Sequence, residues 1–408
     1  MANEATDVIV GIDTHTDTHH VAVITGYGKP LADREFLAVG SGYRKIVDFI
    51  TSHGTVTAVG IEGTGSYGAE LARTLRGEGL TVLEVNRPNR AERRLHGKSD
   101  PLDAYQAAQS VLAERGISVP KAKDGPVECL RILRTARSSA AKARTVAVNQ
   151  IKGLLVSAPE GLRAKYRGLG TPALITALQR ARPSGHVADP EYVTLLTLKA
   201  LAVRYQSLAA EIAAADASLQ EILDTYAPML CDLTGVGTEV ASQLLVTVGD
   251  NPERIGSEPQ FAALVGAAPI PASSGKTTRH RLSRGGDRNA NRALHHVVLV
   301  RMSSCSRTRD YVNKRTAEGK SKREIMRCLK RYVAREIYRQ ITDPQPAPTN
   351  ADLRQQRNKL GFTINAAASH LNQWPSVISR LERGLIRNDA LAATYRQWLA
   401  EQTPQNAN

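Results

Sequence analysis

The sequence predicts a chain of mixed fold class, α/β at its N-terminal end and α-helical over most of the remainder. Residues 7–115 alternate short apolar runs rich in Val and Ile with amphipathic stretches, which is typical of strands and helices in turn. From about residue 128 to 228 the apolar residues recur with helical spacing, and few β-branched residues alternate. A chain of 408 residues is long enough for roughly two to four domains with real cores.

The N-terminal elements are expected to form a meander of three strands followed by alternating helices and strands. Strands are expected at 8–13, 18–25, 31–38, 56–61 and 80–85, with helices near 41–53 and 67–77 and a last helix from Asp100. This order is that of the ribonuclease-H-like fold, although other α/β folds share it. We therefore expect an α/β domain of this kind over residues 1–125.

Three further parts and a linker are expected downstream. Residues 126–228 indicate two long amphipathic helices separated by a loop, a helical hairpin of the coiled-coil kind that spaces domains or dimerises. Residues 229–342 form a compact basic unit, and the prolines within 343–350 indicate a stiff linker. Residues 351–400 form a small helical unit at the end.

The composition favours a nucleic-acid partner in a reducing compartment. A net charge of +15 favours a polyanion, and aromatic residues at only 4% argue against base stacking as the main contribution to binding. Cys129, Cys231, Cys305 and Cys328 are scattered without a CxxC pair, which argues against a zinc site or a disulfide framework. Because the sequence offers neither a signal peptide nor an apolar run of membrane-spanning length, we expect a cytoplasmic protein without a membrane partner.

Four carboxylates predict a site for a divalent cation. Asp13 and Glu62 each end an apolar run, and the carboxyl ends of neighbouring parallel strands meet at one edge of a sheet. Asp100 and Asp103, three residues apart, share one face of a helix. Oxygen ligands of this kind suit Mg²⁺, with Mn²⁺ as the alternative, and two such cations could flank a scissile phosphate. Taken singly, each acid could instead cap a turn or a helix N-terminus.

Three histidines follow Asp13 closely. His15, His19 and His20 suggest a zinc cluster at first sight, since imidazole is a common zinc ligand. A solvent-exposed turn is the simpler interpretation, and we expect one here.

A basic loop carries a candidate nucleophile. Residues 266–275 are rich in Gly, Ala and Pro and end in Ser273-Ser274-Gly275, and the cations that follow are Lys276, Arg279, Arg281, Arg284 and Arg288. A serine hydroxyl beside a phosphate held by guanidinium groups could attack phosphorus. The resulting phosphoserine conserves the energy of the phosphodiester, as strand exchange requires and hydrolysis does not. The alternative, simpler from the residues alone, is a binding loop whose serines only hydrogen-bond phosphates.

Glycines and basic helices supply further candidate contacts with nucleic acid. The run from Leu233 to Gly237 before an apolar helix resembles a helix-hairpin-helix, in which the amides of Gly235 and Gly237 would meet a phosphate. A plain helix-turn-helix packing unit is an equally good interpretation. Basic residues within 130–156 and 301–339 are candidates for contacts with RNA or DNA phosphates.

Taken in order, these motifs resemble those of the DEDD transposases of bacterial insertion sequences, the IS110 family, which also includes site-specific DNA invertases. The resemblance covers residues 7 to about 340 and rests on Gly11–Asp13, Ile61–Gly63, Lys98–Asp103, Leu233–Gly237, Gly266–Gly275 and Arg281–Asn289. It implies a RuvC-like domain in which Asp13, Glu62, Asp100 and Asp103 hold Mg²⁺. It also implies a coiled-coil spacer and a transposase domain whose nucleophilic serine directly precedes glycine. Ser274 meets that condition, and Ser273 is the reserve.

The resemblance also implies partners. Enzymes of this family act on paired DNAs, the element ends and the target, as dimers to tetramers with composite sites formed across subunits. A structured non-coding bridge RNA from the element selects donor and target. The family likeness therefore implies a bacterial protein associated with the nucleoid.

Residues 351–400 extend past the usual end of the family and resemble a Cro/repressor-type helix-turn-helix. The second helix would begin near Thr363, and a recognition helix over about 375–383 would present Ser376, Ser379 and Arg380 to the major groove. Asn372 and Gln373 stand where such a turn more often has glycine. A degenerate module kept for contact with protein is the alternative.

The sequence thus predicts a metal-dependent DNA transposase that excises and inserts an insertion sequence through a serine–phosphate intermediate. One alternative is a RuvC-like nuclease that cuts DNA by hydrolysis with the carboxylates alone, which would leave no protein–DNA adduct. The other is a non-catalytic helix-turn-helix DNA-binding regulator, which would leave the four ordered acids unexplained.

Overall fold

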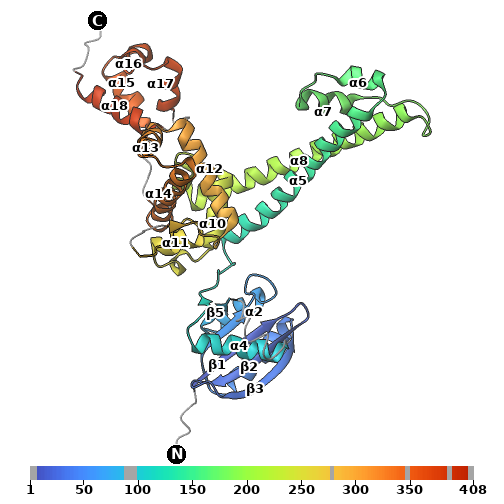
Figure 1. The fold of residues 1–408 in the computed structure, drawn as a ribbon, viewed down its shortest axis with the longest axis vertical. Coiled ribbons are helices and arrows are strands. Elements are labelled where there is room, and N and C mark those ends of the chain that lie inside the picture. Colours follow the sequence, from blue (N-terminus) through green and yellow to red (C-terminus); the bar gives the residue numbers. More distant parts are fainter. Residues whose placement is uncertain (1–6, 87–98, 276–279, 345–349, 384–387, 403–408) are drawn as a thin grey trace, which may run out of the picture. The chain divides into compact units, whose positions relative to one another are not determined.

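The chain divides into two compact units in a computed structural model (Figure 1), which describes residues 7–86, 99–275, 280–344, 350–383 and 388–402. Unit 1 comprises Met1–Gly125 together with Val248–Arg254, and unit 2 comprises Pro126–Thr247 and Ile255–Asn408. The predicted fold class, α/β at the N-terminal end and mostly helical beyond it, is confirmed.

Unit 1 is built on a six-stranded sheet in the order β3-β2-β1-β4-β5-β6. The strands are β1 (Asp7–Thr14), β2 (Thr18–Thr25), β3 (Pro30–Leu37), β4 (Thr55–Glu62), β5 (Val82–Val85) and β6 (Ile117–Ser118). β1, β4 and β5 run parallel, while β2, β3 and β6 pair antiparallel with their neighbours. The two central parallel strands, β1 and β4, are rich in Val and Ile, as expected for strands covered on both faces.

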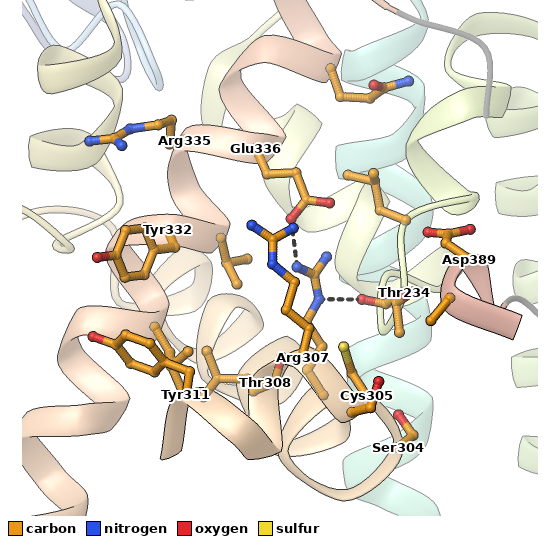
Figure 2. Close-up of a pocket in the computed structure, with 18 of the residues that line it drawn as sticks. Thr234, Ser304, Cys305, Arg307, Thr308, Tyr311, Tyr332, Arg335, Glu336 and Asp389 are labelled. Carbon is orange, nitrogen blue, oxygen red and sulfur yellow. Dashed lines mark hydrogen bonds and ion pairs between the residues drawn. The ribbon is translucent and has the colours of Figure 1, made fainter. Parts of the chain in front are cut away.

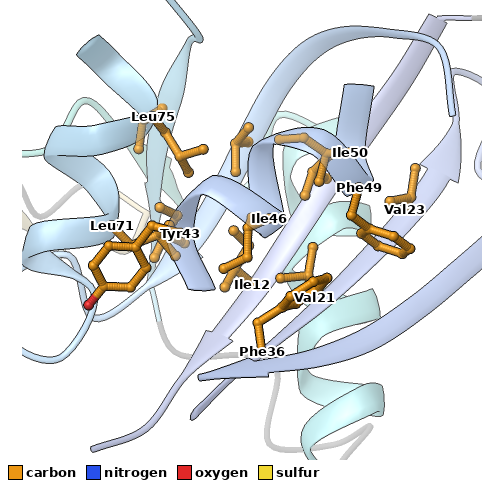
Figure 3. Close-up of a cluster of buried hydrophobic side chains, with 14 of the residues drawn as sticks. Ile12, Val21, Val23, Phe36, Tyr43, Ile46, Phe49, Ile50, Leu71 and Leu75 are labelled. Carbon is orange, nitrogen blue, oxygen red and sulfur yellow. The ribbon is translucent and has the colours of Figure 1, made fainter. Parts of the chain in front are cut away.

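Helices cover both faces of this sheet. On one face, α1 (Gly40–Thr51) and α2 (Ala69–Gly77) contribute Ile46, Ile50 and Leu71 to a core that includes Ile12 (Figure 3). On the other face, α4 (Asp100–Leu112) packs on Ile9. Successive residues of β1 therefore point to opposite cores, which is the strand period of two.

The contact between α4 and β1 is unusually close because β1 carries Gly11. A Cβ atom at Gly11 would lie 2.1 Å from the carbonyl oxygen of Ala104 and 2.3 Å from the amide nitrogen of Ala108. The backbone of the helix thus lies where a side chain would otherwise stand. This close packing brings the first turn of α4 to the carboxyl end of β1.

Unit 2 begins with a long helical hairpin, seen at the upper right of Figure 1. Its two arms are α5 (Pro126–Ser157) and α8 (Pro190–Tyr226), which pack along one another. At the far end, α6 (Glu160–Tyr166) and α7 (Thr171–Arg180) enclose a small core with residues of both arms, including Ile151 and Leu198. Small and apolar residues such as Ala140 and Ala215 are buried between the arms.

The rest of unit 2 contains two helical groups. The first comprises α9 (Pro228–Cys231), α10 (Thr238–Val248), α11 (Glu258–Leu264), α12 (Arg288–Ser304), α13 (Ser306–Ala317) and α14 (Lys322–Thr342), with the two-stranded ribbon of β7 (Ile270–Pro271) and β8 (His280–Arg281). The second comprises α15 (Ala351–Lys359), α16 (Ile364–His370), α17 (Pro375–Glu382) and α18 (Asp389–Ala400) around a core of its own. No helix among the described residues is long and apolar enough to cross a membrane.

Candidate active site

Asp13 and Glu62 lie beside one another at the carboxyl end of the sheet in unit 1. The strands β1 and β4 are parallel and in register, with Ile12 opposite Ile61, so the two acids are the next residues along the two strands. The Thr14 hydroxyl donates a hydrogen bond of 2.7 Å to the main-chain carbonyl of Glu62 and ties the strand ends together. Asp13 is buried, with 7% of its surface exposed, although it is an acid.

The other two predicted acids lie on the first turn of α4. Asp100 is the first helical residue, after Ser99 with extended backbone at the N-cap position, and Pro101 follows it. Asp103, one turn on, is 3% exposed. Acids in the first turn of a helix are stabilised by the helix dipole. Asp100 and Asp103 therefore favour the start of a helix at this point.

His15 joins the acids, which sequence reasoning did not foresee. Its Nε2 lies 3.1 Å from Oδ2 of Asp13 and 3.3 Å from Oδ1 of Asp100. One ligand atom from each of these three residues falls within 4.8 Å of the others, a grouping that could hold a metal ion. His15 follows the end of β1 at Thr14 and lies two residues from Asp13, and this closeness in the sequence was the available signal.

The prediction that the three histidines form a solvent-exposed turn is wrong for His19 and His20. Both lie on β2; His20 contacts Asp33 at 2.7 Å, and His19 is fully buried. The ring of His19 stacks on Tyr43 at a centroid distance of 5.8 Å, and burial lowers the pKa of His19 so that its neutral form is favoured. Only His15 of the three takes part in the acidic cluster.

The acidic cluster has the electrostatics of a cation site. Burial raises the pKa of the Asp13 carboxyl, the negative charges of Asp103 and Asp100 raise it further, and His15 opposes them. Like charges gathered around a buried carboxyl are costly unless a proton or a cation neutralises them. The donors are carboxylate oxygens and one imidazole nitrogen, so Asp13, Asp100 and His15 fit a divalent cation.

The candidate nucleophile lies in the loop of a short β-hairpin in unit 2. β7 and β8 pair antiparallel, with Ile270 opposite Arg281 and Pro271 opposite His280. Ser273 and Ser274 are exposed and follow β7 after Ala272. Gly275 then takes a φ of +55°, a left-handed conformation that favours glycine at this turn.

The predicted cations of this loop are only partly described. Arg281, Arg284 and Arg288 are exposed, on β8, in the segment after it and at the start of α12. Lys276 and Arg279 lie outside the described residues.

Comparisons with known proteins bear on both sites. The family model of the DEDD transposases of IS110, described as "Transposase", matches residues 10–158, which include all four predicted acids. A second model, "Transposase IS116/IS110/IS902 family", matches residues 227–313, which include Ser273 and Ser274. The chain belongs to the IS110 family of transposases.

Relatives of this transposase extend over most of its length. An uncharacterized 43.6 kDa protein of insertion element IS110 from Streptomyces coelicolor is 24% identical over 390 residues, 83% of this chain and 95% of that protein. An uncharacterized 42 kDa protein of insertion element IS900 from Mycobacterium paratuberculosis is 23% identical, covering 85% and 99%. The transposase for insertion sequence element IS1328 of Yersinia enterocolitica is 29% identical over 180 residues, 43% of this chain and 50% of that protein.

A network of polar contacts fixes the base of the hairpin in the transposase. The amide of Asn291 on α12 donates to the main-chain carbonyls of Val265 at 2.9 Å and Gly266 at 3.0 Å. Its Oδ1 accepts a bond of 2.8 Å from Nζ of Lys330 on α14, a half-buried lysine whose pKa is lowered by burial. The two legs of the hairpin are the segments that lead into β7 and out of β8. Asn291, with Lys330 bound to it, holds the start of the first leg.

Asp287 secures the other leg of the hairpin. Its Oδ1 accepts from the main-chain amides of Asn289 and Ala290 and caps α12, while Oδ2 accepts a bond of 2.7 Å from the hydroxyl of Thr247. Gly286 has a φ of +84°, and a Cβ there would lie 2.6 Å from the amide nitrogen of Gly266. The two legs therefore meet backbone to backbone.

The glycine turn at 233–237 packs inside unit 2 on one side. Gly235, with a φ of +83°, rests against Val297 and Val300 of α12, and the Thr234 carbonyl accepts a bond of 2.7 Å from Nε of Arg301. No described atom lies within 4 Å of a Cβ built at Gly237. The packing role of Gly235 is thus observed, and a phosphate contact at Gly237 remains a prediction.

Several basic residues expected to contact nucleic acid are engaged within the protein. On α5, Arg134 donates to Glu239 and Gln243 of α10, and Arg137 pairs with Asp216 of α8. In the 301–339 stretch, Arg301, Lys330 and Arg331 have internal partners. Lys314, Lys322, Arg323 and Arg327 are exposed and remain candidates.

The C-terminal group has helices where the sequence places the helix-turn-helix. The hydroxyl of Thr363 accepts from the amide of Ala366 and caps α16, and Asn372 makes the turn before α17 with a φ of +49°. Asparagine is among the residues that tolerate this conformation, so the missing glycine does not prevent the turn. On α17, Ser376 and Arg380 are exposed and Ser379 is partly exposed.

Proposed function

We propose that this transposase cuts and rejoins DNA through a covalent link between Ser274 and a DNA phosphate, with Mg²⁺ held by Asp13, Glu62, Asp100 and Asp103. The observation that carries the proposal is the exposed position of Ser274 in a braced hairpin, within the segment that matches the transposase family. Mn²⁺ is the alternative cation for this site, since both ions take oxygen ligands. The order of strands in unit 1 supports a RuvC-like fold for it.

The covalent step conserves the phosphodiester. The Oγ of Ser274 attacks phosphorus, the Oγ–P bond forms, and the bond from phosphorus to the departing deoxyribose oxygen breaks. The proton lost by the serine hydroxyl balances the proton gained by the departing oxygen. A deoxyribose hydroxyl of a second strand then reverses the step, which joins the new strands and releases Ser274.

Each exposed cation near Ser274 has a role in this proposal. Arg281, Arg284 and Arg288 hold phosphate oxygens, because guanidinium groups bind phosphate in a bidentate fashion and keep their charge. Asn291 and Lys330 act as positioning residues, since they hold the base of the hairpin.

The acidic cluster of unit 1 supplies the second part of the proposal. Bound Mg²⁺ would stabilise the charge that develops on the phosphate oxygens. Asp13, Glu62, Asp100 and Asp103 would hold it with oxygen ligands. Glu62 stands beside Asp13 on the neighbouring strand, and the charges of Asp103 and Asp100 act on the Asp13 carboxyl. His15 orients Asp13 and Asp100 through its contacts with both.

We further propose a guide RNA and a composite site, both of which the family likeness suggests. The net charge of +15 and the exposed cations of α14 are compatible with RNA as well as DNA. Sequencing the RNA that co-purifies with the protein from cells carrying its flanking DNA tests the guide. A single structured RNA from the element supports it, and the absence of an enriched RNA removes it.

Trapping the covalent adduct on DNA tests the proposed function. With an end substrate that cannot religate, Ser274→Ala should form no adduct and bind DNA as the wild type does, while Ser273→Ala should retain the adduct. Adduct formation by Ser274→Ala would assign the nucleophile elsewhere. Cleavage without any adduct would favour the hydrolytic nuclease, and DNA binding without cleavage would favour the helix-turn-helix regulator.

Mixing variants tests the composite site. Ser274→Ala and Asp13→Asn should each be inactive alone. If acids and serine act from different subunits of a dimer or tetramer, a mixture of the two proteins should regain strand cleavage. A mixture as inactive as its components would place both groups of one site on the same chain.

We also propose that α17 contacts DNA through Ser376, Ser379 and Arg380. Deleting residues 351–408 should weaken binding to the element ends or its promoter. Unchanged affinity and unchanged regulation would leave contact with protein as the role of this group.

A further inference from the structure

A large open pocket lies in unit 2 away from the serine hairpin. It has a volume of about 1240 Å³ and is lined mainly by α12, α13 and α14 (Figure 2). Further lining residues come from the segments around Met229 and Thr234 and from Asn388, Asp389 and Ala390 at the start of α18. This exceeds the space that a drug-sized molecule fills, which is about 300–1,000 Å³. The pocket could therefore accept part of a polymer.

The lining of the pocket is rich in arginine. Five arginines line it: Arg301, Arg307, Arg309, Arg335 and Arg339. Arg301 is committed to the fold, since it donates to the Thr234 carbonyl and pairs with Glu336 at 2.5 Å. Within the described part of the chain, neither Arg307 nor Arg335 forms an ion pair, and both are exposed. Glu336, Asp343 and Asp389 also line the pocket, and Glu336 is paired with Arg301. Arg307 and Arg335 thus present guanidinium groups without an ion-pair partner among the described residues, as a phosphate site requires.

Two tyrosines stand beside these arginines. The rings of Tyr311 and Tyr332 meet edge to face with centroids 5.7 Å apart, and Figure 2 places them on the same side of the pocket as Arg335. Tyr332 is 53% exposed, which is high for an aromatic side chain that lines a pocket. Its contact with Tyr311 restricts the ring, and the exposed part of the side chain is accessible to a ligand. Only 4% of the residues of this chain are aromatic, so a pair of them in a basic pocket points to a specific use.

The spacing along α14 gathers these groups on one face. Tyr332, Arg335 and Arg339 stand at positions i, i+3 and i+7, which share one side of a helix. An aromatic ring and two cations on one helix face supply the two kinds of contact that bind a single nucleic-acid strand, base stacking and phosphate binding.

We propose that this pocket binds an unpaired stretch of a single nucleic-acid strand, with a base stacked on Tyr332 and phosphates held by Arg335, Arg339 and Arg307. A duplex keeps its bases stacked inside, so it could use the arginines but not the ring. The pocket is separate from the proposed catalytic groups and goes beyond the proposed function, because binding here requires no covalent step.

Binding of oligonucleotides measured by fluorescence anisotropy tests this proposal. The probes are a single-stranded DNA, the RNA of the same sequence, and a duplex of equal length. Tyr332→Ala should weaken binding of the single strands by roughly 5- to 150-fold, the range for the loss of one stacked base. Tyr332→Phe should retain binding, and Tyr226→Ala, which removes an exposed tyrosine from the end of α8, is the matched control.

The salt dependence separates a specific phosphate contact from general charge. Arg335→Ala should reduce the slope of log K against log salt for single strands by about 0.7, the value for one phosphate contact. Arg204→Ala, which removes an exposed arginine from α8, changes the net charge equally and should leave the slope unchanged. Similar losses for DNA and RNA single strands would indicate a shared site, and a loss for only one would identify the strand that the pocket receives.

Two results would overturn the proposal. One is a Tyr332→Ala variant that unfolds at the wild-type temperature and binds single strands as the Tyr226→Ala control does. The other is an equal loss of single-strand and duplex binding in the same variant. Repeating the titrations in Ser274→Ala protein keeps the outcome independent of the covalent chemistry, so failure of either proposal can be recognised separately.

Discussion

Replacing Gly11 with alanine should separate α4 from β1 and so disturb the acidic cluster without touching an acid. The added Cβ would lie 2.1 Å from the Ala104 carbonyl oxygen and 2.3 Å from the Ala108 nitrogen. Both are backbone atoms, so no side chain can rotate away, and α4 must move by more than about 1 Å to reach an ordinary contact distance. Overpacking of this kind costs about 1–3 kcal/mol of folding free energy.

The displacement should affect activity more than stability. Each kcal/mol lowers the melting temperature by roughly 3–6 °C in a domain of this size. Moving Asp100 and Asp103 by about 1 Å relative to Asp13 should reduce strand cleavage on the order of 100-fold, because misplacement of that size is costly for catalysis. Calorimetry of the full chain gives the first quantity, and cleavage assayed below the melting temperature gives the second.

Gly77→Ala is the matched control for this experiment. Gly77 ends α2 in the same unit, and no described atom lies within 4 Å of a Cβ built there. The same substitution at Gly77 should leave stability unchanged or raise it by up to about 1 kcal/mol, since alanine restricts the unfolded chain. If Gly11→Ala and Gly77→Ala melt and cleave alike, the close packing of α4 on β1 does not position the acids.

Asp13→Asn should change how the metal-free protein responds to pH. Burial raises the pKa of Asp13 above 3.8, so the folded state binds this proton more tightly and loses stability as pH rises through the raised value. Calorimetry in EDTA should find this loss of stability in the wild type and not in the variant. Equal dependence of stability on pH in the two proteins would contradict a raised pKa for Asp13. Asn291→Ala should cost about 1–3 kcal/mol, because it removes two hydrogen bonds and the partner of Lys330, and it should slow adduct formation. Asn289→Ala, at an exposed position, should change neither stability nor the rate of adduct formation. Identical adduct rates for Asn291→Ala and this control would contradict the positioning role of Asn291. Arg357→Ala should destabilise the C-terminal group by about 3–5 kcal/mol, because Glu382 is left buried without its cation. Arg354→Ala, at an exposed position, is the control. Equal melting temperatures of the two variants would refute a stabilising role for the buried ion pair.

The strands and acids of unit 1 could be predicted because their signals are local. Short apolar runs rich in Val and Ile predict β1 and β4, and an acid at the end of each run gives Asp13 and Glu62. Parallel pairing then brings the two acids together, because Ile12 lies opposite Ile61 and each acid is the next residue. The order of the residues along the chain is therefore sufficient to predict that these two acids are neighbours.

His15 and His19 could not be assigned correctly because their environments depend on tertiary packing. Both follow the same strand-turn-strand pattern, but His19 points into the core against Tyr43, whereas His15 points toward Asp100 of a distant helix. Because Asp100 is remote from His15 in the sequence, no local pattern reveals this contact.

The basic residues illustrate the same limit. Charge patterning predicted that Arg301 and Lys330 bind nucleic acid, yet each has an internal partner contributed by another helix, Glu336 and Asn291. The arginines that remain available, such as Arg335, differ from these only in what the fold places beside them. Tyr332 was missed for a related reason, since exposure of its ring follows from the packing of α13 on α14.

The central claim, a covalent phosphoserine at position 274, is tested most directly by mapping the protein–DNA adduct on the wild-type chain. Protein trapped on an end substrate that cannot religate would be digested with protease and nuclease, and the peptide carrying the residual nucleotide sequenced by mass spectrometry. We predict one modified peptide, with the nucleotide on Oγ of Ser274. A nucleotide on any other residue, or complete strand cleavage with no modified peptide, would contradict it.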